Sequence, residues 1–506
     1  MVRFVWPADF VLTGFGVLRL NVAFDGRRFS HISSPALARR PTCFLLAGGD
    51  PPDLRLLMSS QPLTSMDSAS GTGQQLYRRA RARIPGGAQL LGKRPEQYLP
   101  GGWPAYYRRA QGCTVWDLDD RPYLDFTSNG IGTCLLGYAD PVVNAAVTDC
   151  VARGNMCTLN SPAEVELADL LCAIHPWASK VRYARTGGEA MSISVRIARA
   201  HTRRGVVAFC GYHGWSDWYL AANLGASDAL NGHLLPGLDP DGVPRALHGS
   251  ALPFRYNQIG ELEQIVAAHR SELAAIVMEP RRYDPPTDGF LEKVRSLADE
   301  TGAVLIFDEI TAGWRSNHGG MHLTLGVLPD IAVFAKAMSN GFPMSAIIGR
   351  GDVMDAAQQT FISSTYWTES IGPTAAVATL QRLEQLDVAR HVDEIGSMVR
   401  SGWKAAAART GLPIKVVGIP ALCILAFDAG ETSRALMTLF TQEMLARGFL
   451  AAGSLYPTYA HKPDLVVRYL AAVEEVFGLM KEHLDHGSVL KALHGPVAQS
   501  GFARLT

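Results

Sequence analysis

The sequence predicts an α/β fold, with a mostly parallel central sheet in a large domain and a second, smaller α+β domain. Between about residues 127 and 375, short apolar runs alternate with helical patterns, as in sheets that are covered by helices. The expected strands are 205–210, 274–278, 303–308 and 331–336. A crossover helix is expected at 289–302, because its apolar residues share one face and Gly302 is a natural C-terminal stop.

The smaller domain is predicted from both ends of the chain. Near the N-terminus, 74–84 has helical spacing, and 113–126 has the alternation of a hairpin that turns at Asp119 and Asp120. Towards the C-terminus, a long helix is expected at 374–387, and mixed patterns follow. The expected division is an N-terminal extension at 1–66, a first segment of the small domain at 67–126, the large domain at 127–375, the C-terminal small domain at 376–490 and a tail at 491–506.

The extension has loop-forming residues and no sustained period. We expect it to be poorly ordered, or to reflect an overlong gene start with Met58 or Met66 as the alternative first residue.

The composition excludes several classes of protein. Among 506 residues, 47 Lys and Arg balance 47 Asp and Glu, so no global charge favours nucleic acid or an anionic membrane as a partner. No apolar run approaches the roughly 18–20 residues of a membrane helix. The eight cysteines are scattered without a CxxC pair or a Cys/His cluster, which predicts reduced thiols, a cytoplasmic protein and no metal site.

Two neighbouring expected strands end in opposite charges, Asp308 in one and Lys336 in the other. In an open parallel sheet, functional groups gather at the carboxyl ends of the strands, so both charges would share one crevice. A structural ion pair is the alternative interpretation.

Two further motifs fall at the same edge of the expected sheet. The segment 186–201 places Gly187 and Gly188 at the start of a helix, where free N–H groups and the helix dipole favour a phosphate, although such a pair can also be a plain turn. Tyr212 and His213 directly follow a strand, and an aromatic ring there could cover a flat cofactor or simply pack on the surface.

Taken together, these motifs resemble a known family. The order TGGEA, GYHGW, MEP, FDEI, FAKAMSNG and SSTYW, between residues 186 and 367, is similar to class III pyridoxal-phosphate aminotransferases of fold type I. Within that class, the glutamate-1-semialdehyde aminomutase-like group is the most similar. The resemblance covers roughly residues 74–486 and implies pyridoxal phosphate (PLP) as the cofactor of the large domain.

The resemblance also implies roles for individual residues. Lys336 would hold PLP as a Schiff base and shuttle the proton on the substrate carbon, and Asp308 would keep the pyridine nitrogen protonated. The turn Thr186, Gly187 and Gly188 would bind the phosphate, and Tyr212 would stack on the pyridine ring.

The family's phosphate site is completed by a threonine from a second subunit. Thr365 matches that position best, with Thr368 as its rival, which implies a homodimer with shared active sites.

Several departures from the family pattern bear on the substrate. The usual turn reads SGSEA or SGTEA, and Thr311 stands where many relatives have glutamine. Leu90 and Lys93 occupy the places of a serine and an arginine that recognise the mutase substrate, and a lysine lacks the bidentate fork of arginine. Bulky Tyr366 and Trp367 would reshape the pocket. Structural and functional interpretations are evenly balanced for Trp103, His213, Glu279, Arg281, Arg282 and Arg315.

We therefore predict an aminotransferase that moves an amino group from a small-molecule donor to a separate carbonyl acceptor, such as a keto acid, an aldehyde or a keto sugar. The alternatives are a glutamate-1-semialdehyde aminomutase and a catalytically silent, aminotransferase-like subunit. A dehydrogenase is disfavoured, since no GxGxxG turn follows an early strand.

Overall fold

The computed structural model describes residues 71–233, 236–281, 283–287, 289–499 and 501. The predicted extension at 1–66 lies outside the described residues. All that follows concerns the unit Gln61–Thr506.

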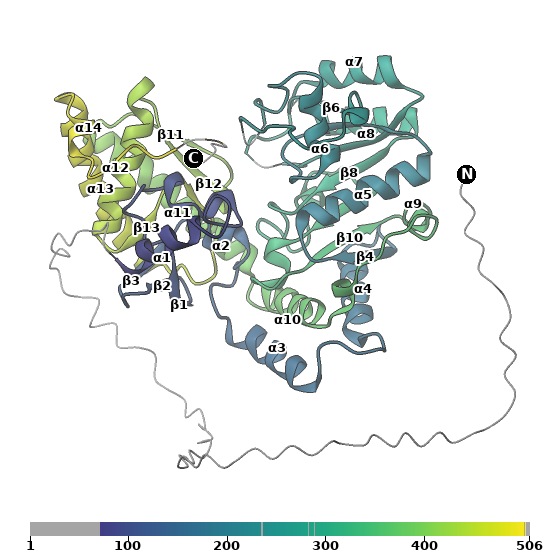
Figure 1. The fold of residues 1–506 in the computed structure, drawn as a ribbon, viewed down its shortest axis with the longest axis horizontal. Helices are drawn as coiled ribbons and strands as arrows, with labels where there is room; N and C mark the ends of the chain where they lie inside the picture. The colour runs from purple at the N-terminus through teal and green to yellow at the C-terminus, as the bar shows by residue number, and fades with distance from the viewer. Residues whose placement is uncertain (1–70, 234–235, 282, 288, 500, 502–506) are drawn as a thin grey trace, which may run out of the picture. The chain divides into compact units, whose positions relative to one another are not determined.

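The central sheet has seven strands in the order β4-β10-β9-β8-β7-β5-β6. β10 is antiparallel to both of its neighbours, whereas the pairs β9–β8, β8–β7, β7–β5 and β5–β6 are parallel. The mostly parallel sheet of the prediction is therefore confirmed (Figure 1). The strands are β4 (Lys180–Ala184), β5 (Val206–Cys210), β6 (Ala251–Pro253), β7 (Leu273–Met278), β8 (Val304–Asp308), β9 (Ile331–Phe334) and β10 (Ser345–Gly349).

Helices cover both faces of this sheet, which explains why its middle strands are apolar throughout. Ile306 of β8 faces a core shared with α5, whereas Leu305 and Phe307 face a core shared with α7 and α8. The crossover helix predicted at 289–302 is α8, and Gly302 ends it in a left-handed conformation. The helices of this part are α2 (Asn129–Gly132), α3 (Pro141–Arg153), α4 (Pro162–Ile174), α5 (Gly187–Thr202), α6 (Asp217–Leu220), α7 (Ile259–His269), α8 (Phe290–Thr301), α9 (Gly351–Met354) and α10 (Ile371–Gln385).

One strand end differs from the prediction. β9 stops at Phe334, so Lys336 lies two residues beyond the strand instead of ending it. Lys336 opens the 3₁₀ turn η8 (Lys336–Ser339) with a φ of +46°, a conformation that hydrophobic periodicity does not reveal. Asp308 is the last residue of β8, as predicted.

Strands from both ends of the chain form a second sheet, β1-β2-β3-β13. The predicted hairpin 113–126 corresponds to β2 and β3, and β3 pairs in parallel with β13. A three-stranded sheet, β11-β12-β14, and five helices complete this part. The elements are α1 (Thr72–Arg81), β1 (Tyr107–Gln111), β2 (Thr114–Asp117), β3 (Pro122–Phe126), α11 (Val388–Thr410), β11 (Ile414–Val417), β12 (Cys423–Phe427), α12 (Ser433–Ala446), β13 (Phe449–Ala451), β14 (Ser454–Leu455), α13 (Pro463–Asp485) and α14 (Val489–Ala492).

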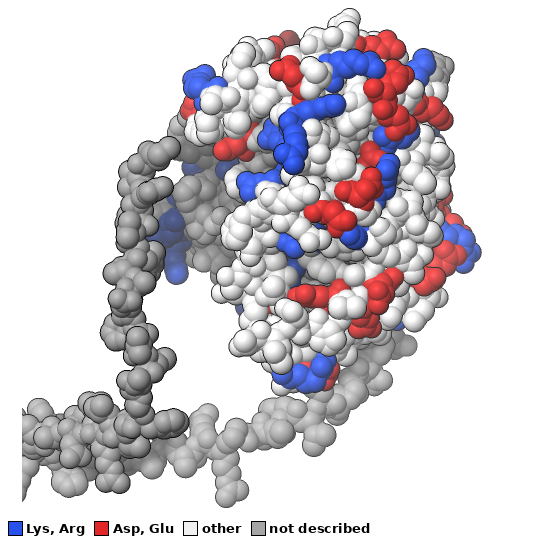
Figure 2. All heavy atoms as spheres, turned by 90° about the vertical axis from the view of Figure 1, so that its right-hand side faces the viewer, with Lys and Arg blue, Asp and Glu red and all other residues white. Residues whose placement is uncertain are grey.

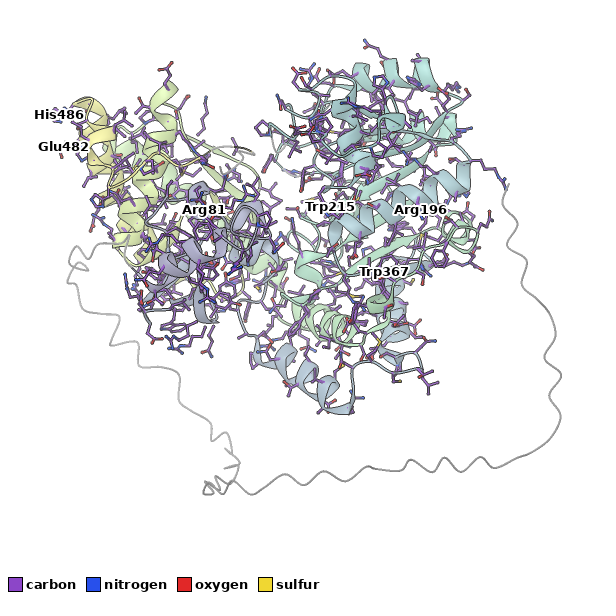
Figure 3. All side chains as sticks on the ribbon, in the orientation of Figure 1. Arg81, Arg196, Trp215, Trp367, Glu482 and His486 are labelled. Carbon is purple, nitrogen blue, oxygen red and sulfur yellow. The ribbon has the colours of Figure 1, made fainter. Side chains whose placement is uncertain are left out.

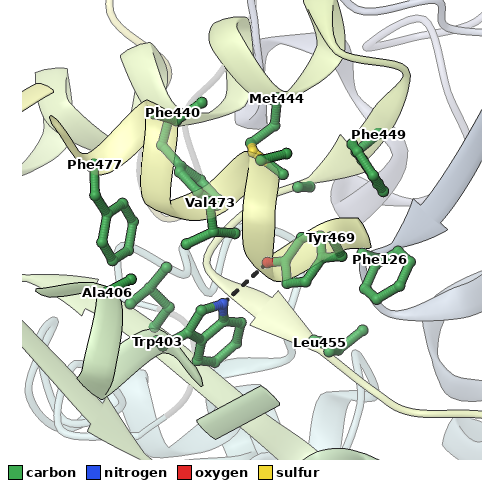
Figure 4. Close-up of a cluster of buried hydrophobic side chains, with 14 of the residues drawn as sticks. Phe126, Trp403, Ala406, Phe440, Met444, Phe449, Leu455, Tyr469, Val473 and Phe477 are labelled. Carbon is green, nitrogen blue, oxygen red and sulfur yellow. Dashed lines mark hydrogen bonds between the residues drawn. The ribbon is translucent and has the colours of Figure 1, made fainter. Parts of the chain in front are cut away.

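A shared core joins these N- and C-terminal segments. Phe126 of β3 stacks on Tyr469 of α13 with ring centroids 4.2 Å apart, and the Trp403 indole donates a hydrogen bond to the Tyr469 hydroxyl at 3.1 Å (Figure 4). α10 runs across the predicted boundary at 375 and packs in the same core as α3 and α4. The division into domains stays a prediction.

The surface is consistent with the balanced composition. On the face drawn in Figure 2, basic and acidic side chains are interspersed. Among the described residues, no helix is both long enough and apolar enough to span a bilayer.

Candidate active site

Asp308 ends β8 with its carboxylate held by two hydrogen-bonding partners. Oδ1 accepts from the Ile310 backbone N–H at 3.0 Å, and Oδ2 lies 2.8 Å from Nδ1 of His213. Both side chains are buried. The other ring nitrogen of His213, Nε2, lies 3.0 Å from the Cys210 carbonyl, so both ring nitrogens have a hydrogen-bonding partner. His213 thus fixes the carboxylate from the loop after β5, a role that the sequence left undecided.

Lys336 lies at the same edge of the sheet, because β9 is the direct neighbour of β8. Its Nζ donates a hydrogen bond to the Thr311 hydroxyl at 2.7 Å. From the sequence, Thr311 is notable only because it stands where many relatives have glutamine. In the structure this residue orients the amine.

The start of α5 is closed by reciprocal hydrogen bonds. The Glu189 N–H donates to the Thr186 hydroxyl at 3.4 Å, and the Thr186 N–H donates to the Glu189 carboxylate at 2.9 Å. The first-turn N–H groups of Gly187 and Gly188 have no acceptor within the helix. The turn can therefore present two amides and the positive end of the helix dipole to an anion.

Both glycines of this turn are closely packed. A Cβ on Gly187 would lie 2.9 Å from Cδ1 of Ile310, and a Cβ on Gly188 would lie 3.1 Å from the indole nitrogen of Trp215. The loop after β5 thus lies directly against the first turn of α5.

Tyr212 lies in that loop and lines a cavity of about 380 Å³ together with Glu279, Tyr256 and His233. Glu279 is buried. Burial, together with the nearby His213, lowers the pKa of His233 to about 4, which keeps this imidazole neutral at pH 7. The lining of this cavity therefore includes aromatic rings, the carboxylates of Glu279 and Asp284, and the Arg255 side chain.

A second cavity, of about 440 Å³, includes Lys93 in its lining, together with Trp103 and Tyr98, whose rings stack 4.5 Å apart. Burial raises the pKa of Tyr98 to about 12. Leu90 is half-exposed and does not line this cavity.

Arg315 connects this cavity to Thr311, the residue whose hydroxyl accepts from Lys336. It donates to the carbonyl of Gly132, next to the cavity residue Ile131, and its Nε donates to the Thr311 carbonyl at 2.8 Å. The guanidinium is buried, so Arg315 is not a surface group. Arg282 lies outside the described residues.

The loop that carries both candidate threonines is attached to the residue before the α5 turn. The Arg185 guanidinium donates to the carbonyls of Trp367 at 3.0 Å and Glu369 at 2.8 Å. Thr368 donates its hydroxyl to the Thr365 carbonyl at 3.0 Å. Within the described residues, the exposed Thr365 hydroxyl makes no hydrogen bond.

Comparison with known proteins identifies the family. The model of the family described as aminotransferase class-III matches residues 100–471. The chain belongs to the class III aminotransferases.

This class III aminotransferase is similar to several curated proteins. It is 32% identical over 391 residues to 2'-deamino-2'-hydroxyneamine transaminase of Streptomyces kanamyceticus, covering 76% of this chain and 93% of that protein. It is 30% identical over 431 residues to glutamate-1-semialdehyde 2,1-aminomutase of Nitrosomonas europaea, covering 80% and 97%. Among solved structures, the PLP internal aldimine form of the FumI protein of Sphingopyxis sp. MTA144 matches with a TM-score of 0.74 and 26% identity, covering 82% of this chain and 98% of that one.

The cofactor of the class III aminotransferase is PLP, and its substrates are an amino donor and a carbonyl acceptor. The residues present fit this cofactor, since an amine, a buried carboxylate and an amide-rich helix start lie at one edge of the sheet. PLP supplies an aldehyde that condenses with amines and a ring that withdraws electrons from the substrate.

Proposed function

We propose that this class III aminotransferase moves an amino group between two separate molecules. The observation that carries the proposal is the cavity of about 440 Å³ that includes Lys93, Tyr98 and Trp103 in its lining. A mutase holds one small substrate through both halves of its reaction and benefits from a tight carboxylate clamp. A wide aromatic cavity with a single-point cation instead suits the exchange of one substrate for another.

The chain's own residues would share the chemical work at the sheet edge. Lys336 would carry the proton to and from the substrate carbon, and the Thr311 hydroxyl would hold its amine in position. Asp308, fixed by His213, would place a negative charge against the cofactor's ring nitrogen. Tyr212 would cover the ring, and Thr186, Gly187 and Gly188 would bind the phosphate through the start of α5.

A homodimer would complete each site. The exposed Thr365 hydroxyl is available for the phosphate of a partner subunit, whereas the Thr368 hydroxyl is engaged by the Thr365 carbonyl. Two large, exposed apolar side chains lie at this loop, Phe361 just before it and Tyr366 within it. The partner subunit would cover both. We place the enzyme in the cytoplasm, as its scattered cysteines suggest.

The mutase is kept as a second candidate, because 30% of aligned residues match a glutamate-1-semialdehyde 2,1-aminomutase. A silent subunit is disfavoured by the intact Lys336 and Asp308 with their partners.

The test follows the two half-reactions separately. The PLP-loaded enzyme is mixed with single amino donors, including glutamate and alanine, and the released carbonyl product is quantified against enzyme sites. We expect one equivalent per site without an acceptor, and continuous turnover only after a keto acid, an aldehyde or a keto sugar is added. Conversion of glutamate-1-semialdehyde alone, with no such requirement, would instead establish the mutase.

A pair of lysine variants tests the site itself. Borohydride should fix PLP on Lys336, located by peptide mass spectrometry, and Lys336→Ala should abolish both the labelling and amino transfer. Lys415→Ala is the matched control, since Lys415 is an exposed lysine paired with Asp428 and should leave both unchanged. If the wild type takes up no PLP, the alternative of a catalytically silent, aminotransferase-like subunit replaces the proposal.

A further inference from the structure

The indole of Trp215 lies against the first turn of α5. A Cβ on Gly188 would lie 3.1 Å from Nε1 and 3.2 Å from Cδ1 of Trp215, so the edge of the ring that carries the N–H faces the turn. Figure 3 shows Trp215 and Arg196, a residue of the second half of α5, towards opposite ends of this helix.

The backbone on both sides of Trp215 is fixed to α5. A Cβ on Gly214 would lie 3.2 Å from Cα of Gly188, and the φ of +102° at Gly214 favours glycine. On the other side, the hydroxyls of Ser216 and Ser192 are 2.7 Å apart, and the Ser192 hydroxyl donates to the Gly188 carbonyl at 2.9 Å. The position of Trp215 therefore results from contacts of its neighbours, not from burial of its own ring.

Trp215 itself is 71% exposed. Packing alone does not account for a large aromatic side chain that is held at a helix start yet remains in solvent. Its polar atom is a hydrogen-bond donor that cannot accept, which is the property that an anion at this turn requires.

Among the turn's own side chains, only the Thr186 hydroxyl can donate to an anion. The Thr186 hydroxyl accepts from Glu189, Gly188 has no side chain, and the neighbouring Arg185 is directed to the carbonyls of Trp367 and Glu369. The indole nitrogen lies within reach of the space that a hydroxyl on residue 188 would occupy.

We propose that Trp215 binds the phosphate of PLP, donating its indole N–H to a phosphate oxygen at the Gly187–Gly188 turn. The inference rests on the phosphate site of the proposed function. Trp215 then makes the enzyme prefer the phosphorylated cofactor over pyridoxal, and it supplies from the loop after β5 a second side-chain donor beside the Thr186 hydroxyl.

The first experiment measures equilibrium binding of PLP and of pyridoxal to the apoenzyme of the wild type and of Trp215→Phe, which keeps a ring but removes the N–H. A hydrogen bond to a charged group stabilises by about 1.5–3 kcal/mol, so the Kd for PLP should rise about 10- to 100-fold. The Kd for pyridoxal should stay unchanged, because it has no phosphate. Equal weakening of both ligands, with or without a change in oligomeric state, would assign the ring to covering the site or the subunit interface and would overturn the inference, as would no change in either.

A second variant tests whether the donor alone matters. Gly188 has a φ that other residues adopt, so Gly188→Ser can be combined with Trp215→Phe. The double variant should recover part of the lost PLP affinity, because the hydroxyl takes the place of the indole N–H. Recovery by Gly188→Ala with Trp215→Phe, which adds no donor, would count against the inference.

Gly188→Asp separates failure of the inference from failure of the phosphate site. A carboxylate at this turn repels a phosphate, so PLP binding should weaken strongly while pyridoxal binding persists. If Gly188→Asp weakens PLP binding but Trp215→Phe does not, only the role of Trp215 is overturned. If Gly188→Asp leaves PLP binding unchanged, the turn does not hold the phosphate, and both assignments fall.

Discussion

His213 Nδ1 lies 2.8 Å from Asp308 Oδ2, which joins the carboxylate at the end of β8 to an imidazole from the loop after β5. Since Nε2 of the same ring lies 3.0 Å from the Cys210 carbonyl, the imidazole is held at both nitrogens. The negative charge at this edge of the sheet is therefore positioned by a second residue, and its orientation does not depend on the cofactor.

The first prediction concerns this pair. His213→Phe removes one of the two hydrogen-bonding partners of the Asp308 carboxylate, and we expect kcat/KM for amino transfer to fall about 10- to 100-fold. His213→Asn, whose amide can reach towards Asp308, should recover part of the loss. The pH dependence of the cofactor absorbance is measured in parallel, because a purely structural defect would lower activity without moving that profile.

The second prediction concerns the Thr311 hydroxyl, which accepts from Lys336 at 2.7 Å. Thr311→Val preserves size but removes the acceptor, so the amine is less well oriented, and we expect kcat to fall about tenfold with a smaller effect on KM. Thr311→Ser keeps the hydroxyl and is the matched control. Equal kinetics for the valine and serine variants would show that the contact does not contribute to turnover.

The third prediction distinguishes Thr365 from Thr368 and tests the dimer. Thr365→Val should weaken PLP binding about tenfold through loss of a hydroxyl to the phosphate, whereas Thr368→Val should not, because its hydroxyl bonds the Thr365 carbonyl.

A mixing experiment shows whether Thr365 acts across subunits. In a heterodimer of Thr365→Val and Lys336→Ala subunits, a site with an intact Lys336 would receive its threonine from the other chain. PLP affinity at that site should then return to the wild-type value. An affinity equal to that of the Thr365→Val homodimer would place Thr365 in its own subunit's site.

Much of this arrangement was predictable because local patterns determine it. The buried strands β7 and β8 are continuous apolar runs, and the Thr186 capping box with its glycines marks the start of α5. The location of Asp308 at a strand end follows from the same pattern.

The remaining features depend on contacts between segments that are distant in the sequence. His213 reaches Asp308 across 95 positions, and Arg315 reaches the Gly132 carbonyl across 183. Neither contact leaves a periodic signal in the sequence, so the roles of both residues could not be decided from the sequence alone. The left-handed backbone of Lys336 is likewise set by its surroundings, because its side chain has no local preference for a positive φ.

The fourth prediction concerns Lys93, an exposed cation in the lining of the cavity of about 440 Å³. If it attracts a substrate carboxylate, Lys93→Ala should raise KM for keto acids about 3- to 10-fold and leave KM for neutral aldehydes unchanged. The effect should shrink as salt is added, because an exposed charge is screened. Lys93→Arg keeps the charge as the control, and identical changes for charged and neutral acceptors would exclude this role.

The fifth prediction concerns stability at low pH. Burial lowers the pKa of His175 from its ordinary 6.5 to about 4, with smaller contributions from nearby His322 and His318. The unfolded chain therefore binds a proton that the folded chain excludes. The stability that His175 contributes is fully present above pH 6.5 and is lost as the pH falls towards 4.

His175→Phe tests this contribution in a site already lined by Trp314 and Phe334. The Leu171 carbonyl keeps a hydrogen bond from the backbone N–H of residue 175 at 3.0 Å, so the substitution leaves no carbonyl unpaired. Between pH 7 and 5, the free energy of unfolding of the wild type should fall by about 2 kcal/mol more than that of the variant. Urea unfolding of both proteins at several pH values, with equal protein and cofactor concentrations, gives the free energy of unfolding of each as a function of pH. The same dependence of the free energy of unfolding on pH in both proteins would mean that His175 takes up its proton in the folded protein as readily as in the unfolded chain.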